Sequence, residues 1–245
     1  MAAQPEVKEE SLTDSYLYRL SRTVPTIRYR SYSRWEEARR TGADWEWWFL
    51  FHGRNLRLRV QAKKLRPEKS IRGDLARKNK HGGQLAMLIK SARSCSAIPM
   101  YVFFAGPSHC PTACGAVAGT AGAYVVPAFA IRSLVALRRS VNDTAALSRA
   151  RPAACLACCF LLGSQQDAAR QVAHWLSEFR DEQADVFSED YGWHTTLPSY
   201  VVEVARGRDS ERVLGGGERN GAPEDIQAVL TVDLRESVSR EEATR

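Results

Sequence analysis

The sequence predicts an α/β fold, because strand-like and helix-like hydrophobic patterns follow one another along the chain. Two strand patterns between residues 44 and 63 are followed by a helical pattern at 83–93 and by the apolar, β-branched run Ile98–Phe104. Apolar residues that recur every three to four positions indicate a helix, whereas short β-branched and aromatic runs indicate strands. This order favours an α/β sandwich built around one core.

The remaining elements are predicted from the same kinds of pattern. Leu12, Tyr16 and Leu20 share one side of a helix at 9–21, which ends before Pro25. An extended stretch follows at 27–32, and a helical turn begins at Ser33 and closes at Gly42. Beyond the run at 98–104 the patterns predict three further elements: a helix at 127–139, a strand at 154–162 and a helix at 168–179.

The chain of 245 residues has room for one sizeable domain, which we place at residues 8–205. From residue 206 the sequence turns to Gly, Arg, Glu, Asp and Ser and shows little apolar periodicity. Such a composition buries too little apolar surface to offset the entropy of ordering. We therefore expect residues 206–245 to form a disordered or weakly structured tail that is dispensable for folding.

Charge is distributed unevenly along the chain. The formal net charge is +7, yet residues 54–93 alone hold thirteen Lys or Arg against two acids, Glu68 and Asp74. A block of this kind indicates a surface for a polyanion. The alternative is an ordinary solvated basic loop.

The N-terminal sequence and the cysteines bear on location. The first ten residues are polar and acidic, without the basic and apolar regions of a secretory signal, so we expect a cytoplasmic protein with reduced thiols. The uncharged stretch 110–131 is broken by proline and glycine, which favours a buried segment over a membrane span. Cysteines at 110, 114, 155 and 158, with His109 beside them, leave a zinc site open as an alternative to buried thiols.

A β-hairpin is predicted at residues 44–63. If Phe51 pairs with Leu56 across the turn, one face becomes wholly apolar, from Trp45 opposite Ala62 onward. The other face then carries four cross-strand pairs: Asp44 opposite Lys63, Glu46 opposite Gln61, Trp48 opposite Arg59 and Leu50 opposite Arg57.

The polar face of this hairpin brings an acid, an amide and a lysine together. Oxygen atoms from Asp44 and Gln61 can hold a hard cation such as Mg²⁺. Such a cation can polarise a phosphodiester and generate hydroxide, and Lys63 can position water or neutralise developing charge. The alternative is an amphipathic hairpin whose polar face makes only cross-strand ion pairs.

Asp44 followed by Gln61-Ala62-Lys63 resembles the PD-(D/E)xK restriction-endonuclease-like superfamily in its Gln variant, as in Mrr-like enzymes. The stretch from Thr41 to Trp48 with Gln61 to Leu65 also looks like an uncharacterised bacterial family suspected of belonging there. The resemblance covers about residues 10–104 and implies an αβββαβ core with a mixed sheet flanked by helices. It also implies that Asp44 and Gln61 bind the metal and that Lys63 is catalytic.

The resemblance further implies a first-helix glutamate, for which Glu37 is favoured slightly over Glu10. We therefore expect an Mg²⁺- or Mn²⁺-dependent endonuclease that acts on DNA, in a restriction or phage-defence setting by family analogy. No membrane partner is expected, and a homodimer is left open. The residues expected to guide the DNA backbone are basic: Arg57, Arg59, Lys64 and Arg66. A non-catalytic nucleic-acid-binding module and a structural protein with a zinc site are the alternatives.

Overall fold

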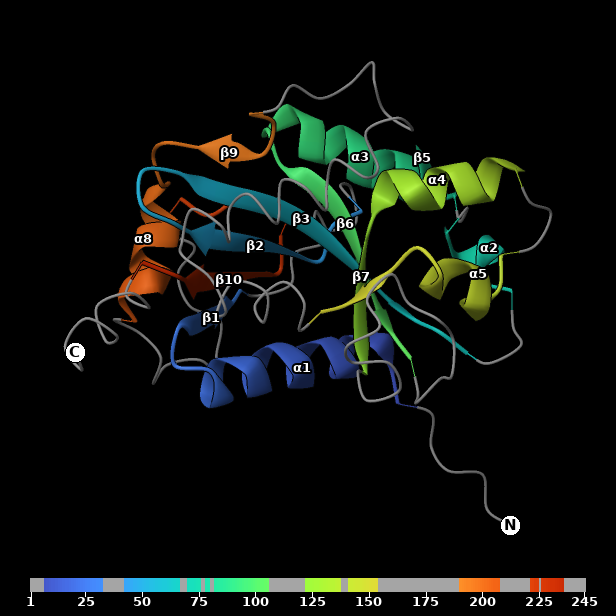
Figure 1. Ribbon diagram of the computed structural model, residues 1–245, viewed down its shortest axis with the longest axis horizontal. Helices are drawn as coiled ribbons and strands as arrows, with labels where there is room; N and C mark the ends of the chain where they lie inside the picture. Colours follow the sequence, from blue (N-terminus) through green and yellow to red (C-terminus); the bar gives the residue numbers. More distant parts are fainter. Residues whose placement is uncertain are drawn as a thin grey trace, which may run out of the picture.

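The protein is an α/β structure in which one mixed sheet is flanked by helices (Figure 1). A computed structural model describes residues 7–32, 42–66, 70–75, 78–79, 82–105, 122–137, 141–153, 190–207, 221–224 and 226–235. The helices are α1 (Glu9–Thr23), α2 (Arg72–Leu75), α3 (Gln84–Ser94), α4 (Ala128–Leu137), α5 (Asp143–Leu147) and α8 (Ser199–Arg206). The strands are β1 (Ile27–Ser31), β2 (Trp45–Leu50), β3 (Asn55–Lys64), β4 (Lys78–Asn79), β5 (Gly82–Gly83), β6 (Ile98–Phe104), β7 (Ala123–Pro127), β8 (Arg151–Pro152), β9 (Trp193–His194) and β10 (Ala228–Asp233).

The main sheet has the strand order β1-β10-β2-β3-β6-β7-β8, and β9 pairs with β3. β10 runs parallel to β2 and β6 runs parallel to β3, whereas the other neighbours are antiparallel. The longer elements from α1 to β6 follow the predicted order αβββαβ, with the short α2, β4 and β5 placed between β3 and α3. The predicted α/β class with a mixed sheet flanked by helices is confirmed.

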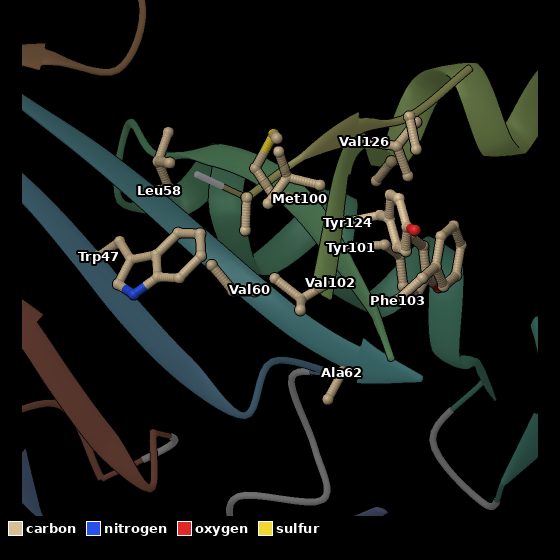
Figure 2. Close-up of a cluster of buried hydrophobic side chains, with 14 of the residues drawn as sticks. Trp47, Leu58, Val60, Ala62, Met100, Tyr101, Val102, Phe103, Tyr124 and Val126 are labelled. Carbon is tan, nitrogen blue, oxygen red and sulfur yellow. The ribbon is translucent and has the colours of Figure 1, made fainter. Parts of the chain in front are cut away.

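Helices cover both faces of the sheet. In Figure 1, α1 lies along one side, and α3 and α4 lie on the opposite side. Apolar residues alternate with polar ones along β3, and together with Trp45, Trp47 and Phe49 of β2 they join a core that extends through β6 and β7 (Figure 2). A second, smaller cluster joins α8 to β2 and β10 through Trp48, Leu50, Tyr200, Val201 and Val229. No helix among the described residues has both the length and the apolar character needed to cross a bilayer.

Several elements predicted from sequence periodicity are confirmed. The patterns at 9–21, 27–32, 83–93, 98–104 and 127–139 correspond to α1, β1, α3, β6 and α4. The predicted turn at 33–42, the strand at 154–162 and the helix at 168–179 lie wholly or mostly outside the described residues.

The predicted hairpin register is wrong by two residues. Trp45 pairs with Val60 and Leu50 pairs with Asn55, so the loop comprises residues 51–54. Gly53 in this loop has φ +79, and the Phe51 N–H donates to the Arg54 carbonyl at 3.2 Å. Because side chains alternate with a period of two, a shift of two residues keeps every side chain on its predicted face. The shift changes only which residues lie opposite one another.

The prediction of an unstructured tail is wrong for β10. Residues 228–233 form a buried strand between β1 and β2, where the backbone pairs on both sides. Its alternate side chains join both cores, Leu230 and Val232 on one face and Val229 on the other. The burial of these apolar side chains offsets the conformational entropy that is lost when β10 becomes ordered. The average composition of residues 206–245 did not reveal this local gain.

Candidate active site

Asp44 directly precedes β2, and backbone contacts fix it on both sides. Its N–H donates to the Val60 carbonyl at 2.7 Å, and its carbonyl accepts from the Gln227 N–H at 2.8 Å. The preceding turn depends on Gly42, which has φ +70 and packs against the first turn of α3. A Cβ at that position would lie 2.6 Å from the Gln84 carbonyl oxygen. Glycine at this turn thus sets Asp44 close to the start of α3.

Gln61 on β3 contacts the Asp44 carboxylate directly. Its Nε2 donates to Asp44 Oδ2 at 2.6 Å, and the Ala62 N–H donates to the same oxygen at 2.8 Å. On its other side, Gln61 Oε1 accepts from Gln84 Nε2 at 2.9 Å. The structure thus brings together Asp44 and Gln61, which the sequence assigned to one site, and adds Gln84 from α3.

Lys63 faces a glutamate from α1 and not Asp44 directly. Lys63 Nζ donates to Glu9 Oε1 at 3.1 Å, and the Lys64 N–H donates to Glu9 Oε2 at 2.9 Å. Both side chains are partly buried, with exposed fractions of 13% for Lys63 and 31% for Glu9. The end of β3 and the start of α1 are therefore joined by this carboxylate.

Glu9 is a site residue that the sequence prediction missed. Glu10 is exposed, whereas Glu9 continues the inward-facing side of α1 with Leu12, Tyr16 and Leu20. An acid on the apolar side of a helix is the signal that identifies Glu9, because such a carboxylate needs a partner. Glu37, which the resemblance favoured, lies outside the described residues.

The pKa of Asp44 is raised from 3.8 to about 7. Burial is the main cause, because the charged carboxylate loses hydration. The hydrogen bond from the Ala62 N–H and the positive charge of Lys63 lower this pKa in part, while Glu9 and Glu10 raise it. The site thus holds a carboxyl whose charged form lacks full compensation, which is a common property of functional sites.

Tyr101 on β6 adds a buried hydroxyl beside these groups. Tyr101 lies opposite Gln61 in the pairing of β6 with β3, and Phe103 lies opposite Lys63. The rings of Tyr101 and Phe103 are stacked, with 5.7 Å between their centroids. The side chain is fully buried, and its hydroxyl has no hydrogen-bond partner within the described part of the chain. Burial raises the pKa of Tyr101, and the charges of Asp44 and Glu9 raise it further. Such a hydroxyl is free to accept or donate a hydrogen bond to a water beside Gln61.

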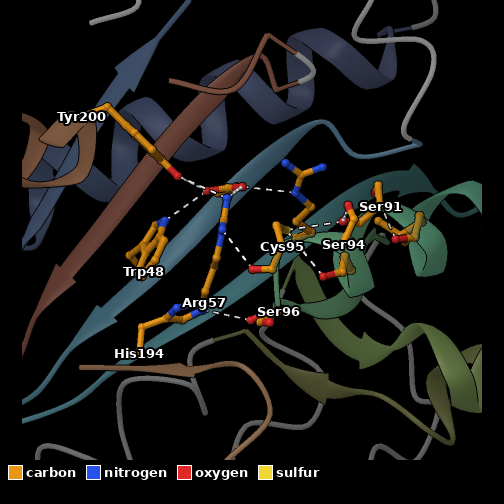
Figure 3. A network of polar contacts seen from close by, with 12 residues as sticks. Trp48, Arg57, Ser91, Ser94, Cys95, Ser96, His194 and Tyr200 are labelled. Carbon is orange, nitrogen blue, oxygen red and sulfur yellow. Dashed lines mark hydrogen bonds and ion pairs between the residues drawn. The ribbon is translucent and has the colours of Figure 1, made fainter. Parts of the chain in front are cut away.

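Arg57 and Arg59 do not form the predicted DNA-binding surface. Arg57 Nη2 lies 2.5 Å and Arg59 Nε 3.1 Å from Glu46 Oε1, in a network that also includes Trp48 and Tyr200 (Figure 3). The two arginine side chains are only 10% and 4% exposed, and Glu46 is fully buried. Residues of α8 close over this face of the sheet. Both guanidinium groups are therefore committed to the interior and unavailable to a phosphate backbone.

The other predicted contacts of the basic block are placed differently. Lys64 Nζ donates to the Val7 carbonyl at 3.1 Å at the surface, and Arg66 is exposed. In the sequence, Lys64 and Arg66 come one and three residues after Lys63. The cysteines proposed for zinc, at 110, 114, 155 and 158, lie outside the described residues, and Cys95 is partly buried.

The site supplies oxygen ligands suited to a hard cation, although it is poor in acids. Asp44, the Gln61 side-chain oxygen and Glu9 are of the type that Mg²⁺ prefers. The buried Asp44 carboxyl, whose charged form is only partly compensated by the Ala62 N–H and by Lys63, is a ligand that a bound cation would stabilise. Among the described residues no three His, Cys, Asp or Glu side chains gather as a metal-binding group, so the amide would have to contribute.

Comparison with known proteins places the chain in one family. Residues 2–239 match the family described as "Family of unknown function (DUF6615)", and because the match spans nearly the whole chain, the protein belongs to this family. No curated protein and no solved structure matches.

Proposed function

We propose that this DUF6615 member is a metal-dependent endonuclease that hydrolyses phosphodiester bonds in DNA, with Mg²⁺ or Mn²⁺ as cofactor. The observation that supports it most is the direct contact between Asp44 and Gln61, made from adjacent strands two residues before Lys63. An acid and an amide can supply oxygen ligands to a divalent cation, and a lysine beside them can stabilise charge that develops on the phosphate.

Each residue has a defined role in this proposal. Asp44, Gln61 and Glu9 would hold the ion, Glu9 taking the place expected of Glu10 or Glu37. A bound divalent cation would supply Lewis-acid polarisation of a phosphoryl oxygen and a hydroxide at neutral pH. Glu9 holds the Lys63 ammonium at the end of β3, where it can orient the attacking water or neutralise charge on the phosphate.

The DNA backbone would be guided by residues 64–83, which connect Lys63 on β3 to Gln84 on α3. Lys64 and Arg66 start this segment, and Gln84 ends it against Gln61. Between residues 64 and 83 the sequence holds seven Lys or Arg against two acids. We therefore propose that basic residues of this segment, and not the buried Arg57 and Arg59, contact the DNA phosphates. Affinity for duplex DNA should fall steeply with salt, with a logarithmic slope of about −0.9 for each phosphate neutralised.

The decisive experiment separates cutting from binding. Supercoiled, linear, single-stranded and methylated DNA are incubated with the protein, with and without Mg²⁺. Lys63→Ala should abolish cleavage and lower DNA affinity only by the worth of one phosphate contact, whereas Asp44→Ala should abolish cleavage and lower Mn²⁺ affinity. Lys64→Ala is the matched control, because it removes at most one phosphate contact at the surface and no group of the candidate site, and it should cut within a few-fold of wild type. Normal cutting by the Lys63 variant would overturn the assignment.

A non-catalytic nucleic-acid-binding module is the second candidate. The observation that favours it is that Asp44 Oδ2 and Gln61 Oε1 are already engaged by protein donors, so the site can be satisfied without an ion. Titration with Mn²⁺ distinguishes the two candidates. Salt-sensitive DNA binding without any Mn²⁺ affinity would favour the binding module.

A further inference from the structure

We propose that Gln84 is a positioning residue that decides which end of the Gln61 amide faces Asp44, and that it thereby sets the affinity of the site for a divalent cation. The inference rests on the proposed function and adds to it a residue outside the predicted hairpin. It concerns a row of three side chains from three different elements: Gln84 at the start of α3, Gln61 on β3 and Asp44 before β2.

The hydrogen bonds of this row are coupled. A side-chain amide has one end that only donates and one end that only accepts. Gln84 Nε2 donates to Gln61 Oε1, which directs the Gln61 NH₂ group toward Asp44 Oδ2 and the Ala62 carbonyl. In this arrangement a donor, and not an oxygen, faces the carboxylate.

Reversal of Gln84 would reverse Gln61 as well. If position 84 presented an acceptor, the only donors of the Gln61 side chain would turn toward it, and Gln61 Oε1 would turn toward Asp44. Two oxygens would then lie side by side, which is unfavourable without a positive charge and favourable around Mg²⁺ or Mn²⁺. The row thus has a closed state, seen in the structure, and a state able to bind a cation.

Gln84 is placed to act in this way. Its backbone carbonyl lies against Gly42, and its side chain is partly buried beside Gln61. It is the first residue of α3, where the helix start packs against the turn before Asp44. Gln84 therefore needs no contact with the ion to influence it.

Gln84→Glu tests the inference, because a carboxylate at position 84 can only accept. Mn²⁺ affinity, measured by isothermal titration calorimetry, should rise by about tenfold or more. Ala86→Glu is the matched control: Ala86 is exposed on the same helix, so this variant adds the same charge without touching Gln61. Its effect should stay within about threefold.

A second background isolates the coupling through the amide. With Gln61→Met in place, Gln84→Glu should do no more than Ala86→Glu, which is the logic of a double-mutant cycle. Far-UV circular dichroism and thermal unfolding are used to check that every variant folds.

If Gln84→Glu and Ala86→Glu have equal effects, or if the gain persists without Gln61, the inference is overturned while the proposed function stands. If neither the wild type nor Gln84→Glu binds Mn²⁺, the inference and the proposed function both fail. Mn²⁺ binding with a gain specific to Gln84→Glu, but no cleavage of any DNA, would leave the inference standing and remove the nuclease activity.

Discussion

Replacing Asp44 by Asn should stabilise the protein at alkaline pH. The folded state raises the pKa of Asp44 from 3.8 to about 7, so between these values the folded protein keeps a proton that the unfolded chain has lost. This group therefore makes the free energy of unfolding fall as pH rises from about 4 to about 7, after which its contribution is constant. Each pKa unit corresponds to about 1.4 kcal/mol, which gives about 4 kcal/mol in all.

Asp44 is partly exposed, so solvent screening reduces this figure to about 2 kcal/mol. Asn keeps an oxygen that accepts from the Ala62 N–H and removes the titration. Urea unfolding of both proteins in EDTA, at pH 5 and pH 8, measures the difference. About a third of this loss has already occurred by pH 5, so the variant should exceed the wild type by less than about 1 kcal/mol at pH 5 and by about 2 kcal/mol at pH 8. Mn²⁺ should then stabilise only the wild type at pH 8. Equal pH dependence of the two proteins would refute the reasoning.

Three further changes test how the site is built. Gly42→Ala places a Cβ 2.6 Å from the Gln84 carbonyl oxygen and strains a φ of +70, so urea unfolding should show a loss of about 2 kcal/mol or more. Tyr101→Phe removes an unpartnered hydroxyl and should leave stability unchanged or raise it by about 1 kcal/mol; a marked loss would reveal a hidden partner. Deletion of residues 207–245 removes β10 and several buried aliphatic side chains worth roughly 1.5–3 kcal/mol each, so the truncated chain should lack cooperative thermal unfolding.

The alternation of side chains was enough to place the candidate site residues on one face, even though the predicted register was wrong. Asp44, Gln61 and Lys63 were assigned to one face by a period of two, which a slip of two residues does not change. The pairing itself depends on where the loop begins, and a four-residue loop at 51–54 or at 52–55 fits the sequence equally well. Asp44 was therefore expected opposite Lys63 but lies against Gln61.

The position of β10 could not be predicted from local pattern. Ala228–Asp233 is a short apolar run set in a charged, glycine-containing segment, and its partners β1 and β2 are about 180 to 200 residues away in the sequence. Periodicity identifies an element by its neighbours in the chain, whereas the burial that orders this strand comes from distant elements.

The buried arginines show how a face that looks polar can belong to the core. The face of the hairpin that carries Arg57 and Arg59 also carries Trp48 and Leu50. Two large apolar side chains on that face indicate that it is buried and is not an exposed surface for nucleic acid. α8 covers that face, and Glu46 then compensates both guanidinium groups inside the protein. Removing one partner from such a buried network costs about 3–5 kcal/mol. The network therefore joins β2 to β3 close to Asp44 and Gln61. It stabilises the strand register in which the Asp44 carboxylate contacts the Gln61 amide.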